Sequence, residues 1–134
     1  MKRAGAVALL LVIGLAGCAT PAPVTTLFDA PRDASDELPA ATSSVDGFDR
    51  DSSRLLFTDV DVAYYAAQGD GDEDTVVCLI TVESTVEGDT ASAACSGRVP
   101  IESRSTGGLE VSFGGETAPS TGWTKRGDFI WSRD

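Results

Sequence analysis

The chain has 134 residues and a formal net charge of −11, and it contains no histidine. So acidic a chain lacks the basic surface that binding to nucleic acid phosphates requires. Without histidine it also lacks the commonest general base, the usual hydrolase triads and the usual ligands of zinc and copper. The composition therefore predicts a protein that is not an enzyme and that carries no cofactor.

The first 17 residues have the layout of a secretory signal. Lys2 and Arg3 precede an apolar run over residues 4–16, and Leu15-Ala16-Gly17-Cys18 follows. The cysteine makes this segment resemble a bacterial lipoprotein signal. That resemblance implies cleavage before Cys18, a diacylglycerol on its thiol, and anchorage at the outer face of the cytoplasmic membrane. The alternative is a short transmembrane helix or an uncleaved anchor, but a spanning helix needs roughly 20 apolar residues.

Residues 18–45 predict a disordered tether behind the lipidated cysteine. They hold Pro21, Pro23, Pro31 and Pro39, and their few hydrophobic residues follow no period. Removal of the basic leader makes the mature chain more acidic still, so anionic headgroups would repel it and the lipid would do the anchoring. We expect one small folded domain over residues 46–134.

The pattern within residues 46–134 predicts a mainly β fold, with α+β as the alternative. We expect one antiparallel sheet of about 5–7 strands, because short β-branched and aromatic runs alternate with glycine-containing turns. Before these strands, residues 49–56 predict a short helical turn with Asp51 or Ser52 as its N-cap. The predicted strands cover residues 62–67, 75–84, 90–95, 109–113, 123–125 and 129–131.

Cys78 and Cys95 predict a disulfide bond, because they form an even pair in an exported chain once Cys18 carries lipid. A free thiol pair or a metal site is the alternative, and two thiols without histidine make a poor metal site. If the two cysteines face each other, residues 85–88 form the turn and Gly88 can adopt a positive φ. One face of this hairpin is then apolar, with Val76, Cys78, Ile80, Val82, Ala91 and Ala93, and the other carries Thr81, Glu83, Thr90 and Ser92.

Several short motifs follow one another along the folded part of the chain. They are Ser53-Arg54-Leu55-Leu56, Tyr64-Tyr65-Ala66-Ala67, Val77-Cys78-Leu79-Ile80, Cys95 and Gly107-Gly108-Leu109-Glu110-Val111. Together they resemble a small extracytoplasmic domain of actinobacterial membrane-anchored proteins. The resemblance covers about residues 53–113 and implies a fold and a compartment, without an activity or a site.

An acidic loop over residues 70–74 offers a weak candidate for a cation site. Asp70, Asp72 and Asp74 have the spacing that opens an EF-hand calcium loop, but Thr75 and Thr81 stand where glycine and a bidentate glutamate are needed. The other interpretation is a solvated turn between two strands. This loop supports our second functional hypothesis, a small-ligand or cation sensor or carrier.

Two further patterns carry less weight. Asp59 and Asp61 share one face of an extended segment, and such a pair hydrolyses glycosides only within a cleft that raises one pKa. Arg126-Gly127-Asp128 matches the integrin-binding tripeptide, although Gly-Asp is also what a tight turn needs. The first pattern gives the third and least favoured hypothesis, a hydrolase.

The aromatic residues give the last candidate, and most of them are expected in the core. Trp123 and Trp131 are the candidates for an exposed patch that binds a partner, either an envelope protein or a glycan. Our first functional hypothesis is therefore a lipid-anchored extracytoplasmic binding module.

Overall fold

The computed structural model describes residues 24–71 and 76–134, which form a mainly β structure of two four-stranded antiparallel sheets. The predicted leader, Cys18, Asp72 and Asp74 lie outside the described residues. Within those two ranges, no helix is both long enough and apolar enough to cross a membrane.

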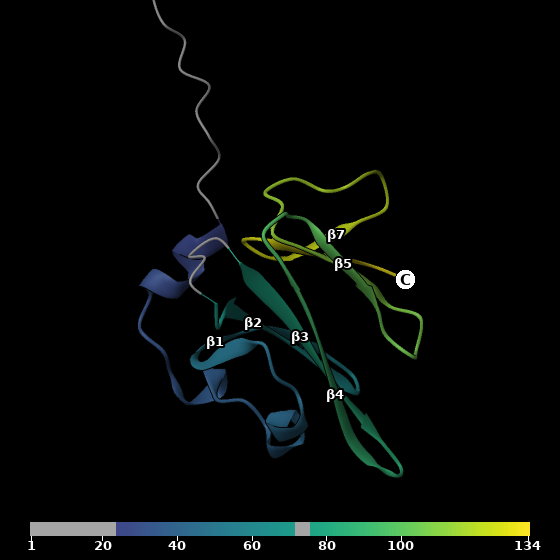
Figure 1. The fold of residues 1–134 in the computed structure, drawn as a ribbon. Helices are drawn as coiled ribbons and strands as arrows, with labels where there is room; N and C mark the ends of the chain where they lie inside the picture. Colours follow the sequence, from purple (N-terminus) through teal and green to yellow (C-terminus); the bar gives the residue numbers. More distant parts are fainter. Residues whose placement is uncertain (1–23, 72–75) are drawn as a thin grey trace, which may run out of the picture.

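The first sheet is a meander of four consecutive strands. Its strands are β1 (Phe48–Asp59), β2 (Val62–Gly69), β3 (Val77–Thr85) and β4 (Gly88–Ser96), and they lie side by side in the order β1-β2-β3-β4 (Figure 1). The predicted strands over residues 62–67, 75–84 and 90–95 are confirmed as β2, β3 and β4. Each strand pairs with its neighbour in sequence, and short turns join β1 to β2 and β3 to β4.

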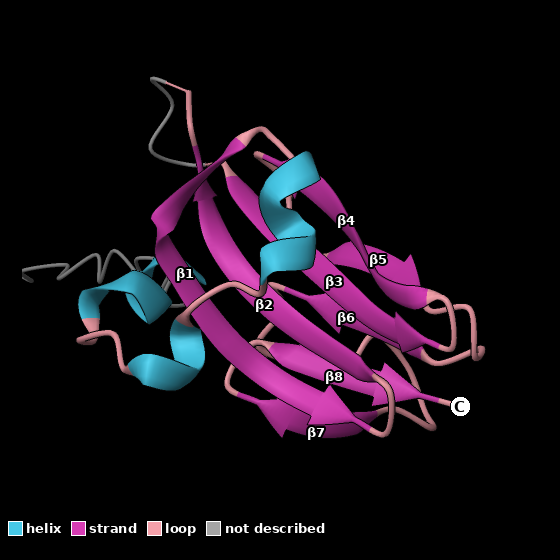
Figure 2. Ribbon diagram, turned by 90° about the horizontal axis from the view of Figure 1, so that it is seen from below, coloured by secondary structure: helices cyan, strands magenta, loops and turns pink. Residues whose placement is uncertain are grey.

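The second sheet is built from shorter strands near the C-terminus. They are β5 (Ile101–Arg104), β6 (Glu110–Phe113), β7 (Thr124–Gly127) and β8 (Ile130–Arg133), in the order β5-β6-β8-β7. Figure 2 shows this sheet behind the first one, so the two sheets form a sandwich. The predicted hairpin around residues 126–128 is confirmed as β7 and β8, but we expected one sheet where the chain forms two.

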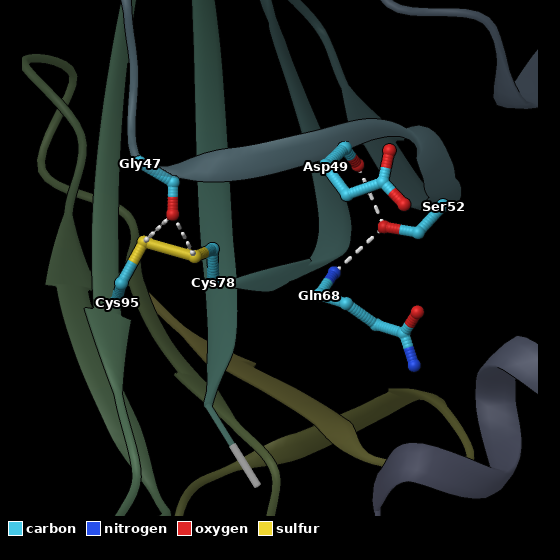
Figure 3. The surroundings of a disulfide bond; sticks show 6 residues. All are labelled: Gly47, Asp49, Ser52, Gln68, Cys78 and Cys95. Atoms are coloured by element: carbon cyan, nitrogen blue, oxygen red, sulfur yellow. Dashed lines mark hydrogen bonds between the residues drawn. A yellow bond between two sulfur atoms is a disulfide. The ribbon is translucent and has the colours of Figure 1, made fainter. Parts of the chain in front are cut away.

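The predicted helical turn over residues 49–56 is wrong, because these residues belong to strand β1. Between Asp49 and Arg54 the strand leaves its regular register with β2. Here the Ser52 hydroxyl donates to the Asp49 carbonyl at 2.7 Å and accepts the Gln68 N–H at 2.8 Å (Figure 3). The serine that suggested a helix cap therefore bridges an irregular strand pair, which short hydroxyl side chains do equally well.

The predicted register of the β3–β4 hairpin is confirmed. Cys78 pairs with Cys95 and forms a disulfide bond with it, and Gly88 adopts a φ of 125° at the turn. The Gly47 carbonyl oxygen lies 3.8 Å from both sulfurs, so the chain entering β1 passes directly over the bond (Figure 3).

Strand β3 is buried on both of its faces, and only one of these was expected. Ile80 lies on the predicted apolar face, whereas Leu79 points to the other side, and both are at most 1% exposed. The predicted face forms an outer core with residues of β2 and of the segment before β1; its buried members are Phe48, Tyr65, Ala67, Cys78, Ile80 and Val82. The second face forms the inner core between the two sheets; its members include Tyr64, Ala66, Val77, Leu79, Val111, Phe113 and Ile130.

Residues 24–45 are not the disordered tether that their composition suggested. They form three 3₁₀ helices, η1 (Val24–Asp29), η2 (Ala34–Asp36) and η3 (Ala40–Ser44). η1 and η2 contact β1, and η3 contacts β4, so the segment wraps the first sheet (Figure 2). Val24 is itself buried in the inner core. The packed structure therefore extends upstream of residue 46, at least to Val24.

Polar contacts to β1 hold this segment in place. Asp36 is 7% exposed, and its carboxylate accepts the Leu55 N–H at 2.8 Å and the Asp33 N–H at 3.0 Å. The Arg54 guanidinium donates to the Phe28 and Ala30 carbonyls at 3.1 and 2.6 Å. The composition gave no sign of the contacts to Leu55 and from Arg54, because they join residues 19 to 26 positions apart.

Candidate functional site

The outward side of the second sheet carries the best candidate surface. Along β6 and β8, Val111, Phe113 and Ile130 point into the inner core, so the alternate residues lie on the opposite side. We call that side the Trp face. It consists of Glu102, Arg104, Glu110, Ser112, Trp123, Lys125, Trp131 and Arg133.

One row of this face is a chain of charged contacts that ends on a tryptophan. Glu110 forms ion pairs with Arg104 through one carboxylate oxygen and with Arg133 through the other. The Arg133 guanidinium lies 4.8 Å from the centre of the Trp123 ring, which is within the range of a cation–π contact. The strand pairing explains these contacts, because Glu110 on the central strand β6 lies opposite Arg104 of β5 on one side and Arg133 of β8 on the other.

The ion pairs fix the charge state of Glu110. The hydrogen bond from Arg104 lowers the pKa of this carboxyl below its ordinary value, and the hydrogen bond from Arg133 lowers it further. Arg104 remains 65% exposed and Arg133 40% exposed, so both cations are accessible from solvent. The carboxylate therefore orients two guanidinium groups without covering them.

Trp131 lies one row away and is half-buried like Trp123. Its indole N–H donates to the Gly115 carbonyl at 3.2 Å, which fixes the orientation of the ring. In the sheet register it lies between Ser112 and Lys125. The two tryptophans that the sequence singled out therefore share one face of one sheet.

A shallow hollow of about 320 Å³ lies beside Trp123 on this face. It is lined by Glu102, Ser103, Arg104, Glu110, Val111, Trp123 and Arg133. Three cationic side chains and two carboxylates give the whole Trp face a slight positive charge, in a chain whose net charge is −11. Sequence reasoning missed the arginines, although the period-two alternation of residues 109–113 already placed Glu110 opposite the core side.

The other sites predicted from the sequence are not assembled in the described residues. Asp70 is exposed, and its two predicted companions lie outside the described ranges. Across residues 24–71 and 76–134, no three acidic or cysteine side chains are close enough to hold a metal ion. The arginine of the Arg126-Gly127-Asp128 tripeptide contacts residues of its own protein, since it donates to the Ser132 hydroxyl at 2.7 Å and lies over the Phe57 ring.

Asp59 and Asp61 both lie at the turn between β1 and β2. Asp59 accepts the Val60 N–H at 3.2 Å, as aspartates in turns commonly do. Glycoside hydrolysis needs two carboxyl groups that flank the scissile bond. Both aspartates come from this one turn, two residues apart, so they approach the hollow that they line from the same segment.

Comparison of the chain with protein-family models, curated proteins and solved structures gave no match in any of the three. Function is therefore argued from the site itself, since a fold alone does not specify an activity.

Proposed function

We propose that the protein is a non-enzymatic binding module of the cell envelope, anchored through a diacylglycerol on Cys18, which binds a protein partner on the Trp face. The observation that carries this proposal is the grouping of Trp123, Trp131 and two accessible arginines on one sheet face. Tryptophan and arginine are the residues most enriched at the energetic centres of protein interfaces.

The rigidity of the Trp face supports a binding role. Ion pairs to Glu110 and the hydrogen bond from Trp131 hold the long side chains in place before a partner arrives. Side chains that are already ordered lose less conformational entropy on binding, so more of the contact energy becomes affinity. Their position on a sheet adds precision that a loop does not provide.

The start of the packed structure bears on the proposed anchor. Val24 is buried in the inner core, and only residues 19–23 separate it from Cys18. A fully extended link of this length spans roughly 20 Å. A chain lipidated at Cys18 would therefore hold its domain close to the membrane surface, and its partner would be a protein of the same membrane or of the adjacent envelope layer.

Site-specific photocrosslinking in intact cells tests the binding surface. The full chain carries p-benzoylphenylalanine in place of Lys125 on the Trp face, or in place of the exposed Glu87 on the β3–β4 turn as a matched control. We expect a discrete protein adduct from position 125 only, and we expect Trp123→Ala with Arg104→Ala to abolish it. The same adducts from both positions, no adduct, or an adduct that glycosidase but not protease removes would contradict a protein partner on this face.

The anchor has its own test. Cells that express the full chain are fed an alkyne-bearing fatty acid, and the wild type is compared with Cys18→Ser. We expect the label and the membrane association to be lost together in the variant. Equal labelling of both proteins would contradict lipidation at Cys18.

A further inference from the structure

Strand β4 forms one border of the first sheet, and its outer edge has no partner strand. The strand order is β1-β2-β3-β4, so β4 pairs with β3 alone (Figure 2). Within residues 24–71 and 76–134, no hydrogen bond joins the backbone of residues 89–95 to a backbone group outside the β3–β4 hairpin. An unpaired strand edge of this kind is a template for one further strand.

The position of the disulfide bond identifies the backbone groups that face this edge. Opposite residues of an antiparallel pair alternate between hydrogen-bonded pairs, with Cα atoms about 5.5 Å apart, and non-hydrogen-bonded pairs, about 4.5 Å apart. The Cα atoms of Cys78 and Cys95 are 4.0 Å apart, so these two residues form a non-hydrogen-bonded pair. By alternation, the groups that point away from β3 are the N–H and C=O of Asp89, Ala91, Ala93 and Cys95.

The other sheet edges have protection that β4 lacks. β1 departs twice from regular register and is contacted by η1 and η2. β5 and β7 have four residues each, and both carry charged side chains. β4 has nine residues in regular register with β3, and none of residues 90–96 is charged. Short length, irregular register and charge are usual ways in which proteins block pairing at a strand edge, and β4 has none of them.

The helix η3 contacts β4 over one face of the strand. Its Ala41 packs against the outer core together with Ala93 of β4. On the opposite face of β4, Thr90, Ser92 and Ala94 are exposed. The second sheet therefore leaves that face of β4 open, and a neighbouring strand can approach the edge beside it.

We propose that β4 pairs with β4 of a second copy of this chain, in antiparallel orientation about a two-fold axis. Such pairing joins two four-stranded sheets into one sheet of eight strands. With Ser92 on the axis, Asp89 pairs with Cys95 of the second copy and Ala91 with its Ala93, so the outward-facing backbone groups are all satisfied. Among the described strands each copy has one such unprotected edge, so the assembly closes at a dimer.

The distribution of charge favours this antiparallel dimer. Glu87 and Asp89 lie at one end of β4, and Arg98 follows the other end. Antiparallel pairing brings the acidic end of one copy to the basic end of the other, whereas parallel pairing would bring like charges together. The uncharged residues 90–96 keep the contact itself free of like-charge pairs, although each chain has a net charge of −11.

Cysteine crosslinking in cells that express the full chain tests this register. Ser92 would face its own copy across the axis in a non-hydrogen-bonded pair, which is close enough for Ser92→Cys to form an intermolecular disulfide bond. Its side chain lies on the opposite face of β4 from Cys95, away from the native bond. Thr90→Cys is the control, because residue 90 is also exposed but its two copies would be about 14 Å apart.

On non-reducing gels we expect a band of twice the chain mass from Ser92→Cys, above any that the wild type gives, and no such increase from Thr90→Cys. No dimer from Ser92→Cys, or as much dimer from Thr90→Cys, would overturn the pairing. A disulfide adduct of another mass would show that a different protein occupies the edge, and would overturn the second copy as its partner.

A lysine on the axis gives a second test, measured by sedimentation equilibrium of the full-length protein. Ser92→Lys places two like charges directly opposite each other, and we expect it to weaken dimerisation about fivefold. Thr90→Lys changes the net charge equally but would face Ala94 of the second copy, so it should weaken dimerisation less than twofold. Both positions are exposed, so both variants should keep the wild-type melting temperature. Equal effects of the two lysines would overturn the register, and a wild type that stays monomeric at millimolar concentration would overturn the dimer.

Discussion

The two outward faces of the sandwich differ in what covers them. The outward face of the first sheet carries the outer core, which includes Cys78 of the disulfide bond, and Leu38, Ala41 and Val45 of the segment before β1 pack against it. The outward face of the second sheet is the Trp face, where the arginines of the ion pairs are accessible to solvent and the two tryptophans are half-buried. One face is therefore part of the folded core, and the other is available to a partner.

Residues 24–45 show how a short segment can pack on a sheet. The helices η1, η2 and η3 have three to six residues each, too short to be stable alone. Side-chain hydrogen bonds stabilise them on β1 instead, from Asp36 and Arg54 and also from Arg50, which donates to the Thr42 carbonyl at 2.9 Å. On the Trp face the polar contacts instead join strands of one sheet.

The largest expected effect on stability comes from a substitution in the outer core, and it is compared with a substitution on the Trp face. Ile80→Ala removes a fully buried side chain from the outer core, and we expect it to cost about 3 kcal/mol of stability. Lys125→Ala on the Trp face is exposed and should change stability by less than about 0.5 kcal/mol. Urea denaturation of both variants measures the difference, and equal costs would mean that the outer core is not part of the cooperative structure.

The disulfide bond should contribute nearly as much as Ile80. It joins residues 17 positions apart, and closing a loop of that size restricts the unfolded chain by about 3 kcal/mol. We expect Cys78→Ala with Cys95→Ala to lose about this much in thermal or urea unfolding. A double variant as stable as the wild type would show that residues 24–45 hold the outer core together without the disulfide bond.

Asp36→Ala should have a smaller effect on stability, confined to residues 24–45 and the part of β1 that they contact. Asp36→Ala leaves the partly buried N–H of Leu55 without its acceptor, which costs about 1–2 kcal/mol. Hydrogen exchange should then show faster exchange of the Leu55 amide and of the amides in residues 24–45. Asp46→Ala, at an exposed position, is the control and should leave those rates unchanged.

The smallest expected effect on stability concerns Glu110 on the Trp face, and it depends on pH. The pKa of Glu110 is lower in the folded protein, chiefly through Arg104 and then Arg133, so the folded state holds the proton less tightly than the unfolded state. The resulting stabilisation is present above the ordinary carboxyl pKa and is lost as pH falls through the lowered folded value. We expect Glu110→Gln to reduce the acid loss of stability below about pH 4.5, measured by unfolding at several pH values. An unchanged acid profile would mean that these ion pairs add nothing to stability.

The sequence by itself determined the local pairings. The pairing of Cys78 with Cys95 predicted a register that the structure reproduces residue by residue. Gly88 marked the turn, and the segment after Trp123 formed the expected hairpin. These features could be predicted because the paired strands are neighbours in the sequence and because side chains alternate between the two faces of a strand.

Only the tertiary structure decided which surfaces became buried. Val77 and Leu79 lie on the hairpin face expected to be polar, but the second sheet packs on that face and forms the inner core. Residues 24–45 lack any apolar period, yet Asp36 and Arg54 bind them to β1. The Trp face joins residues from β5 to β8 and the turn before β7. Each outcome depends on contacts between residues distant in sequence, and the period of a single strand carries no information about them.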